Sequence, residues 1–188
     1  MENIKPVIFR DKVIEGYFVS DQGNVFVDYK VSRCPFTNRF KKIKSLELIQ
    51  LKPFHRKGKL TIDLTFPENL FEYQFHSKHN SGNCNVMTSV HSLVMSAFCP
   101  INENPPNRLK DVWNQIPKEA KEWIQETVFI NHIDHDYTNN KLENLEYVTP
   151  RENSRKAKEF YGGNVSNKKN FKKKTKVKEE QISILKFL

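Results

Sequence analysis

One stretch of the chain, residues 128–153, constrains the fold most. It opens with residues 128–133, a mostly apolar run that is typical of a short strand. Residues 134–141 are polar and contain Asn139 and Asn140, which favours a loop in which both asparagines serve as ordinary turn residues. The next apolar positions predict a second short strand, and they are Leu142, Leu145, Tyr147 and Val148.

A strong helix start follows the second strand. Thr149 suits the N-cap position and Pro150 suits the first position inside a helix. Glu152, three residues after Thr149, completes a capping box. The stretch therefore predicts a strand, a loop, a strand and a helix, with His132 on the first strand and Asn153 in the first turn of the helix.

These residue types suit the hydrolysis of a phosphodiester. The reaction needs a base that deprotonates water and a cation that stabilises charge on the phosphate and on the leaving oxygen. Histidine is the side chain best suited to act as a base near pH 7. Carboxylate and amide oxygens are the ligands that Mg²⁺ takes in proteins. His132 is therefore the candidate general base.

Three segments of the chain belong together: NHID at 131–134, NNKLENLEYVT at 139–149 and PREN at 150–153. In their order and spacing they resemble the HNH endonuclease family, in the variant whose last motif residue is an asparagine instead of a histidine. The resemblance implies a ββα-metal core in which Asn131 and Asn153 hold one Mg²⁺ or Mn²⁺ ion. It also implies that Asn144 orients the loop and the imidazole of His132, and that cleavage leaves 5′-phosphate and 3′-hydroxyl ends.

The sequence departs from the usual family pattern at three positions. The neutral Asn131 stands where the family often has aspartate, so we expect weaker metal binding, helped by Asp134 or Asp136. His135 stands in a slot usually held by glycine, which predicts a reshaped loop. Tyr147 replaces a usual tryptophan, a mild change within a core.

Basic residues follow the motif. The formal net charge of the 188-residue chain is +9, and residues 154–178 carry ten lysine and arginine side chains against Glu159 alone. The remainder is therefore close to neutral. Beside a nuclease motif, contact with phosphates explains such a cluster better than a solvated tail does, and such contacts give affinity without sequence choice. The candidate DNA contacts here are Arg151, Arg155, Lys156 and Lys158.

The cysteines are few and widely spaced, at Cys34, Cys84 and Cys99. No CxxC pair occurs, so we expect neither a disulfide framework nor a structural zinc site. His76 and His79 with Cys84 form a weak zinc candidate, for which a solvated loop is the alternative. No apolar run approaches a membrane span and the first residues lack a signal-peptide pattern, so we expect an intracellular protein without membrane contact.

Residues 15–26 predict a strand, a turn at 21–24 and another strand. With residues 51–59, this segment resembles the small module that precedes the HNH core in many phage and intron-encoded nucleases. Residues 60–66 alternate between apolar and polar side chains, which predicts a half-buried strand. The residues expected near one rim of this β-sheet, as DNA contacts or as a solvated loop, are Lys52, Arg56, Lys57 and Lys59.

Residues 90–98 predict a helix with an apolar face, of the kind that packs beside the metal site in the HNH family. We interpret His91 as a hydrogen-bonded core residue, with a direct catalytic role as the alternative. Residues 101–127 form an insertion with a short helix after Pro117 and with Trp113 and Trp123 as its apolar anchors. The insertion could pack on the core, contact DNA or form a dimer.

The last residues divide into two parts. Residues 162–178 have the composition of a flexible basic linker, and residues 179–188 have the pattern of a short amphipathic helix. In related nucleases a similar segment opens a helix-turn-helix that adds site recognition.

The sequence as a whole predicts an α+β protein of three segments. These are an N-terminal antiparallel β module at 1–80, a ββα-metal nuclease core at 81–160 and a basic tail at 161–188. We expect a site-specific HNH homing endonuclease that acts on double-stranded DNA as a monomer, with a dimer as the alternative. Its gene would belong to a phage, a virus or a mobile intron, and the enzyme would act in the host cytoplasm or nucleoid. The alternatives are an inactive DNA-binding autorepressor and a nonspecific nuclease.

Overall fold

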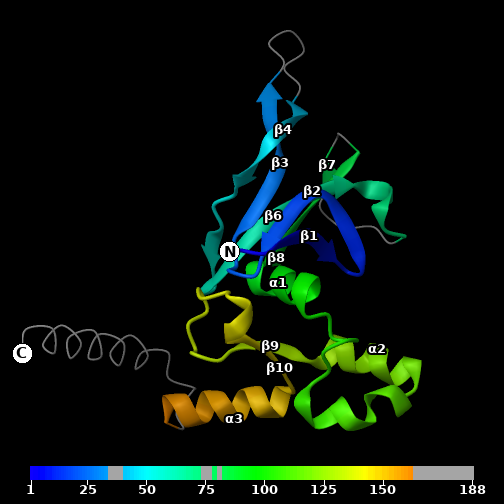
Figure 1. Ribbon diagram of the computed structural model, residues 1–188, viewed down its shortest axis with the longest axis vertical. Helices are drawn as coiled ribbons and strands as arrows, with labels where there is room; N and C mark the ends of the chain where they lie inside the picture. Colours follow the sequence, from blue (N-terminus) through cyan, green and yellow to red (C-terminus); the bar gives the residue numbers. More distant parts are fainter. Residues whose placement is uncertain (34–39, 73–77, 80–81, 163–188) are drawn as a thin grey trace, which may run out of the picture. The chain divides into compact units, whose positions relative to one another are not determined.

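The computed structural model describes residues 1–33, 40–72, 78–79 and 82–162, and it has two compact units, residues 1–147 and 148–188. Antiparallel sheets and a few helices make up the first unit, which confirms the predicted α+β class (Figure 1). Within this unit, the strand that ends at Pro67 pairs with the strand that begins at Asn83, on the other side of residue 80. The segment boundaries at residues 80 and 160 stay predictions. In the described ranges, no helix is long and apolar enough to cross a membrane.

The first sheet has the antiparallel order β1-β2-β3-β4. Its strands are β1 Ile4–Phe9, β2 Lys12–Ser20, β3 Val25–Arg33 and β4 Phe40–Gln50. The predicted strand, turn and strand correspond to β2 and β3, which pair through Tyr17 with Val27 and Val19 with Val25. These side chains are at most 3% exposed, so this face of the sheet belongs to the core.

The second sheet has the antiparallel order β5-β6-β8-β7. Its strands are β5 Phe54–Arg56, β6 Lys59–Pro67, β7 Lys78–His79 and β8 Asn83–Ser89, and the short 3-10 helix η1, Glu68–Leu70, follows β6. The predicted alternation is present in β6, because Ile62, Leu64 and Phe66 are buried while Asp63 is exposed. His76 and the side chain of His79 lie outside the described residues, and so does Cys34.

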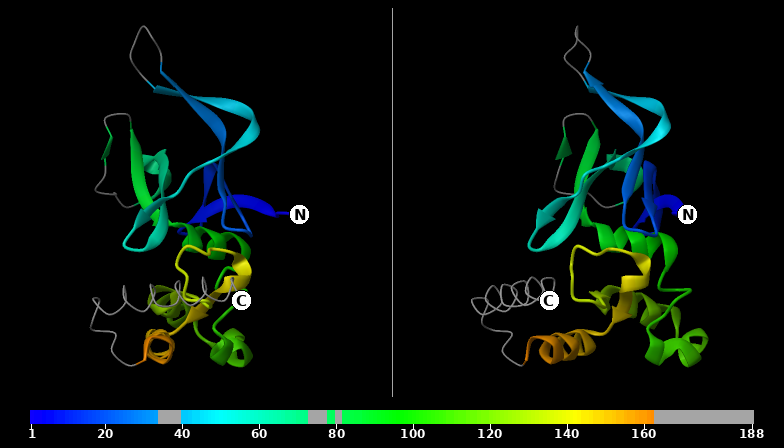
Figure 2. Two further views of the ribbon diagram at one scale, coloured as in Figure 1. Left: turned by 90° about the vertical axis from the view of Figure 1, so that its left-hand side faces the viewer. Right: turned by 60° about the vertical axis from the view of Figure 1, so that its left-hand side comes forward.

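Helix α1, Val90–Phe98, begins where β8 ends and matches the predicted helix. It contacts β1, β2, β6 and β8, and also the 3-10 helix η3, Leu142–Asn144. It lies between the sheets and the loop that follows strand β9, Phe129–His132 (Figure 2). The apolar face of α1 therefore connects the core of the sheets to the segment that carries the motif.

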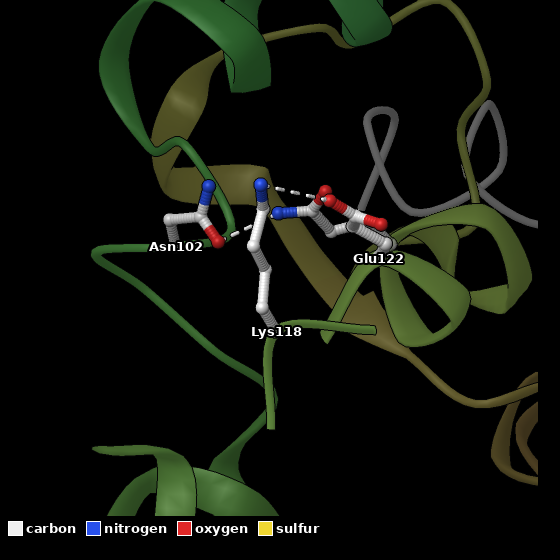
Figure 3. A network of polar contacts seen from close by, with 4 residues as sticks. Asn102, Lys118 and Glu122 are labelled. Carbon is white, nitrogen blue, oxygen red and sulfur yellow. Dashed lines mark hydrogen bonds and ion pairs between the residues drawn. The ribbon is translucent and has the colours of Figure 1, made fainter. Parts of the chain in front are cut away.

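The insertion consists of the 3-10 helix η2, Asn107–Gln115, and helix α2, Lys118–Thr127. Trp113 is buried and its Nε1 donates to the carbonyl of Asn102 at 3.0 Å. Trp123 is 65% exposed, so the prediction that it anchors the insertion is wrong. A hydrogen bond from Gln125 Nε2 to Asn102 Oδ1 at 2.6 Å joins α2 to the segment before η2 instead. An exposed ion pair between Lys118 and Glu122, at 3.7 Å, lies within α2 itself (Figure 3).

The motif segment forms the predicted strand, loop and strand. Strand β10, Leu145–Val148, pairs with β9, and η3 comes directly before it. Leu142 lies in η3 rather than in the strand. The last residue of β10, Val148, begins the second unit.

The second unit contains helix α3, Pro150–Tyr161, with the predicted capping box at its start. Glu152 N donates to Thr149 Oγ1 at 3.2 Å, and Thr149 N donates to Glu152 Oε2 at 3.1 Å. Asn153 lies in the first turn, where its N–H donates to the Thr149 carbonyl at 2.9 Å. The helix ends at Gly162, which has a φ of 70°. The predictions for residues 163–188 lie outside the described residues.

Candidate active site

The candidate base His132 is the last residue of β9 and is only 1% exposed. Its Nε2 lies 3.0 Å from Asn140 Oδ1. The rings of His91 and Tyr137 meet the His132 ring edge-on, with ring centroids 5.1 Å and 5.5 Å away. The imidazole is therefore held by one hydrogen bond and two ring contacts.

The amide of Asn140 determines which nitrogen of His132 carries the proton. Asn140 Nδ2 donates to the Thr138 carbonyl at 3.2 Å, so Asn140 presents Oδ1, an acceptor, to the imidazole. A neutral His132 must then carry its proton on Nε2, and its Nδ1 carries the free lone pair. This is the form of histidine that can accept a proton from water at Nδ1.

Asn144, the middle residue of the motif, holds the loop between β9 and β10. Its Nδ2 donates to Asp134 Oδ1 at 2.8 Å and to the Asn139 carbonyl at 2.8 Å, and its Oδ1 accepts from Asp134 N at 3.0 Å. The expected role in orienting the loop therefore matches these contacts. The hydrogen bond to the imidazole comes from Asn140 instead, a residue assigned from sequence to ordinary turn chemistry.

The carboxylates of Asp134 and Asp136 also act within the loop. Burial raises the pKa of Asp134, but hydrogen bonds from Asn139, Asn144 and the backbone of Asp136 outweigh it, and the net pKa is lowered. Asp136 Oδ1 accepts from both the backbone and the hydroxyl of Thr138, at 2.9 and 2.7 Å. Both carboxylates are thus engaged in holding turns, and a role for them at a metal ion stays a prediction.

His135 occupies a left-handed backbone conformation, with a φ of 62°. Glycine adopts this region freely, whereas a residue with a Cβ is strained there. The backbone therefore keeps the shape that glycine would give at this slot, and the loop accommodates the histidine at some cost in stability. His135 N closes the turn by donating to the His132 carbonyl at 3.1 Å.

Asn131, the candidate ligand next to the base, is 6% exposed. Its Nδ2 donates to Glu146 Oε1 at 2.8 Å, which fixes the orientation of the amide and directs Oδ1 away from Glu146. An amide oxygen is a donor that Mg²⁺ accepts, so the residue fits a hard cation. Within the described part of the chain, no group of three or more His, Cys, Asp or Glu side chains is arranged to hold a metal ion.

His91 lies behind His132 on α1 and is 4% exposed. Its Nε2 lies 3.2 Å from Ser89 Oγ, as expected for a hydrogen-bonded core residue, while its Nδ1 has no hydrogen-bond partner among the described residues. Burial, with smaller contributions from Lys59 and His132, lowers its pKa to about 3. His91 is therefore neutral at physiological pH.

Three of the four basic residues expected near the sheet rim line an open hollow of about 300 Å³. The lining residues are Arg56, Lys57, Lys59, Thr61, Met87, Thr88 and Ser89. Ser89, one of these lining residues, also has its Oγ 3.2 Å from His91 Nε2. Lys52 is exposed and lies outside this lining.

In the second unit, the basic residues and the candidate ligand lie on α3. Arg151, Arg155 and Lys158 are exposed, and Lys156 and Asn153 are half-buried. Arg155 pairs with Glu159 at 3.6 Å across one helical turn.

The family model of the HNH endonucleases matches residues 122–155, which span the end of α2, β9, the loop, β10 and the start of α3. This match confirms that this part of the chain resembles the HNH endonuclease family. Among solved structures, a similar one is described as "DNA binding and cleavage by the HNH homing endonuclease I-HmuI". The two chains are 18% identical, with 94% of this chain and 68% of that chain covered and a TM-score of 0.45. No curated protein matches the chain.

Proposed function

We propose that the protein is a metal-dependent DNA endonuclease of the HNH homing type, in which His132 is the general base. The observation that carries this proposal is the hydrogen bond between His132 Nε2 and Asn140 Oδ1, in a segment that matches the HNH endonucleases. A neutral His132 held in this way keeps Nδ1 ready to take a proton from water, which then attacks the phosphorus. Displacement of the 3′ oxygen would leave 5′-phosphate and 3′-hydroxyl ends.

The proposed metal ligands are Asn131 and, from the second unit, Asn153. The orientation of the Asn131 amide supports its part in this proposal, because its bond to Glu146 leaves the oxygen on the other side. A Mg²⁺ or Mn²⁺ ion supplies charge stabilisation at the phosphate and at the leaving oxygen. Two amides provide no negative charge, so we expect weak metal binding that needs millimolar rather than micromolar metal.

The proposed substrate is double-stranded DNA. The hollow lined by Arg56, Lys57 and Lys59 and the exposed basic residues of α3 support this choice, since lysine and arginine contacts to phosphates supply most nonspecific affinity. We propose that the protein acts as an intracellular monomer with one active site, which would nick one strand in each event.

Cleavage of supercoiled plasmid tests the proposal. The plasmid should carry the DNA that flanks the gene, and a second plasmid without that DNA serves as the control for site specificity. We expect nicking with Mg²⁺ or Mn²⁺, none with EDTA, and none by His132→Ala. Absence of metal-dependent nicking on every DNA would refute the enzyme, and equal nicking of both plasmids would favour a nonspecific nuclease.

A catalytically inactive DNA-binding protein is the second candidate. The neutral Asn131 at a position often held by aspartate favours it, together with the strained backbone at His135. This candidate predicts DNA binding that is equal with Mg²⁺ and with EDTA, and no strand cleavage. A binding assay beside the plasmid assay distinguishes the two.

A further inference from the structure

The turn between β2 and β3 lies directly against the loop that orients the candidate base. Gly23, at the centre of this turn, has a φ of 81°. A Cβ added at Gly23 would lie 2.8 Å from the carbonyl oxygen of Asn140 and 2.9 Å from its carbonyl carbon. Leu142 N donates to the Asp21 carbonyl at 2.8 Å, so a hydrogen bond joins the two segments beside the close approach.

The turn itself is tightly held. Ser20 is fully buried, and its hydroxyl accepts from Asn24 N at 3.1 Å while its carbonyl accepts from Gly23 N at 3.1 Å. The Asp21 carboxylate accepts from the backbone and the side chain of Asn3, at 3.2 and 2.8 Å. The surface that meets Asn140 is therefore held by Asn3, which comes directly before β1, and by hydrogen bonds within the turn itself.

We infer that the β2–β3 turn positions the candidate base, with Gly23 as the positioning residue that acts through Asn140. This inference rests on the proposed function of His132. It assigns to the N-terminal sheet a part in the chemistry that is separate from any contact with DNA. Gly23 is required because only a residue without a Cβ lets the Asn140 backbone come this close.

The effect of a side chain at Gly23 follows from the atoms it would meet. Two of these atoms are backbone atoms of Asn140 and the third is its Cβ, and none of them can turn aside as the end of a flexible side chain can. Asn140 would have to move, and its 3.0 Å bond to His132 Nε2 would lengthen or break. A neutral His132 would then also populate the form protonated on Nδ1, in which Nδ1 has no lone pair to accept a proton from water.

Gly23→Ala tests the inference, and Gly82→Ala is the matched control. Gly82 has a φ of 71°, and a Cβ there meets nothing within 4 Å, so both variants strain the backbone and only one meets Asn140. Two quantities are measured on the full chain. One is the protonated nitrogen of the His132 ring, by long-range ¹⁵N–¹H NMR correlations. The other is the single-turnover cleavage rate at saturating DNA and Mg²⁺.

We expect His132 protonated on Nε2 in the wild type and in Gly82→Ala, and a mixture of the two forms in Gly23→Ala. The cleavage rate of Gly23→Ala should fall about tenfold or more while its DNA affinity changes less than about twofold, because a displaced base weakens general base catalysis alone. If the His132 ring of Gly23→Ala is still protonated on Nε2 alone, the inference is overturned. Equal losses of rate in both variants would also overturn it, since backbone strain alone would then explain them.

A second variant keeps the test decisive if Gly23→Ala does not fold. Asp21→Ala removes the acceptor for both Asn3 bonds and adds no side chain against Asn140. It should loosen the turn and cause a smaller but measurable rise in the Nδ1-protonated form of His132. If that form does not increase, the inference is contradicted. Because the NMR measurement does not need DNA cleavage, a protein that fails to cut any DNA would refute the proposed function and still report on the position of His132.

Discussion

The loop between β9 and β10 and the core beneath α1 are fixed by different forces. In the loop, buried Asn140 and Asn144 make directional hydrogen bonds to neighbouring side chains and carbonyls. In the core, Val19, Leu64 and Leu93 are at most 1% exposed and are held by apolar burial. The energy of apolar burial depends little on the orientation of the side chains, whereas the energy of a hydrogen bond depends strongly on its distance and angle. The core should therefore set how stable the protein is, and the loop should set where the chemistry happens.

The largest effect that separates the two regions is expected for His132→Ala. Loss of the base should lower the cleavage rate by about 10²- to 10⁴-fold, because general base catalysis contributes on that order. DNA affinity should stay within about twofold, since the ring is buried and does not form part of the exposed basic surface. Single-turnover cleavage and a binding titration measure the two quantities. His55→Ala, at an exposed histidine of β5, serves as the control, and an equal loss in that variant would contradict the assignment.

The core should respond to Leu64→Ala in the opposite way. Truncating this fully buried side chain should lower the free energy of unfolding by about 3 kcal/mol, through lost burial and the cavity left behind. Below the new unfolding temperature, cleavage should be nearly unchanged. Leu46→Ala, at a fully exposed leucine of β4, is the matched control and should change stability by less than about 0.5 kcal/mol. Urea unfolding and cleavage at low temperature measure both, and a core variant that loses activity while folded would break the comparison.

Asn144→Ala should affect both stability and rate, because this residue binds several parts of the loop. The substitution leaves Asp134 N and the Asn139 carbonyl without this partner, which should cost about 2 kcal/mol. We also expect a lower cleavage rate, since the loop carries Asn140. Thermal unfolding and single-turnover rates measure the two, with Asn104→Ala at an exposed asparagine as the control. A loss of stability with an unchanged rate would separate Asn144 from the positioning of the base.

Acid should destabilise the protein partly through His91. Its pKa of about 3 lies below the ordinary value of 6.5, so between these values the unfolded chain binds the extra proton. Stability from this group is present above about pH 6.5 and is lost as pH falls, by at most about 1.4 kcal/mol per pH unit. Unfolding temperatures at pH 7 and pH 5 measure the effect. His91→Gln should show a smaller drop, and a drop equal to that of the wild type would assign the acid sensitivity to other groups.

Local patterns in the sequence predicted the elements well where one physical signal dominated. The capping box at Thr149 and Glu152 predicted the start of α3, and alternation predicted β6, because both signals depend on near neighbours in the chain. The role of Asn140 was missed, since Asn139 and Asn140 have the same turn chemistry and only the fold turns one of them toward His132. The only sequence feature that could have indicated this role was the pair Asn139-Asn140 within the part that resembles the family motif.

Two other features depend on packing between distant segments. Gly23 reads as an ordinary turn glycine, and nothing in its neighbours reveals that it abuts Asn140. Trp113 and Trp123 look equivalent as apolar anchors, but Trp113 is buried with its Nε1 bonded to Asn102 whereas Trp123 faces solvent. Which tryptophan is buried depends on how the insertion folds back on itself, and the spacing of apolar residues in the sequence does not show this.

The capping box of α3 has a further consequence for how this segment can change. A helix turns by about 100° per residue, so the distance from Thr149 to Asn153 determines the direction in which Asn153 points around the helix axis. Inserting or deleting one residue between them would rotate Asn153 by more than a quarter of a circle, although the helix itself would still form. The position of Thr149 therefore sets the direction around the helix axis in which each residue of α3 points. Length changes should be tolerated before Thr149 or in the part of the helix between Asn153 and Gly162, and excluded between Thr149 and Asn153.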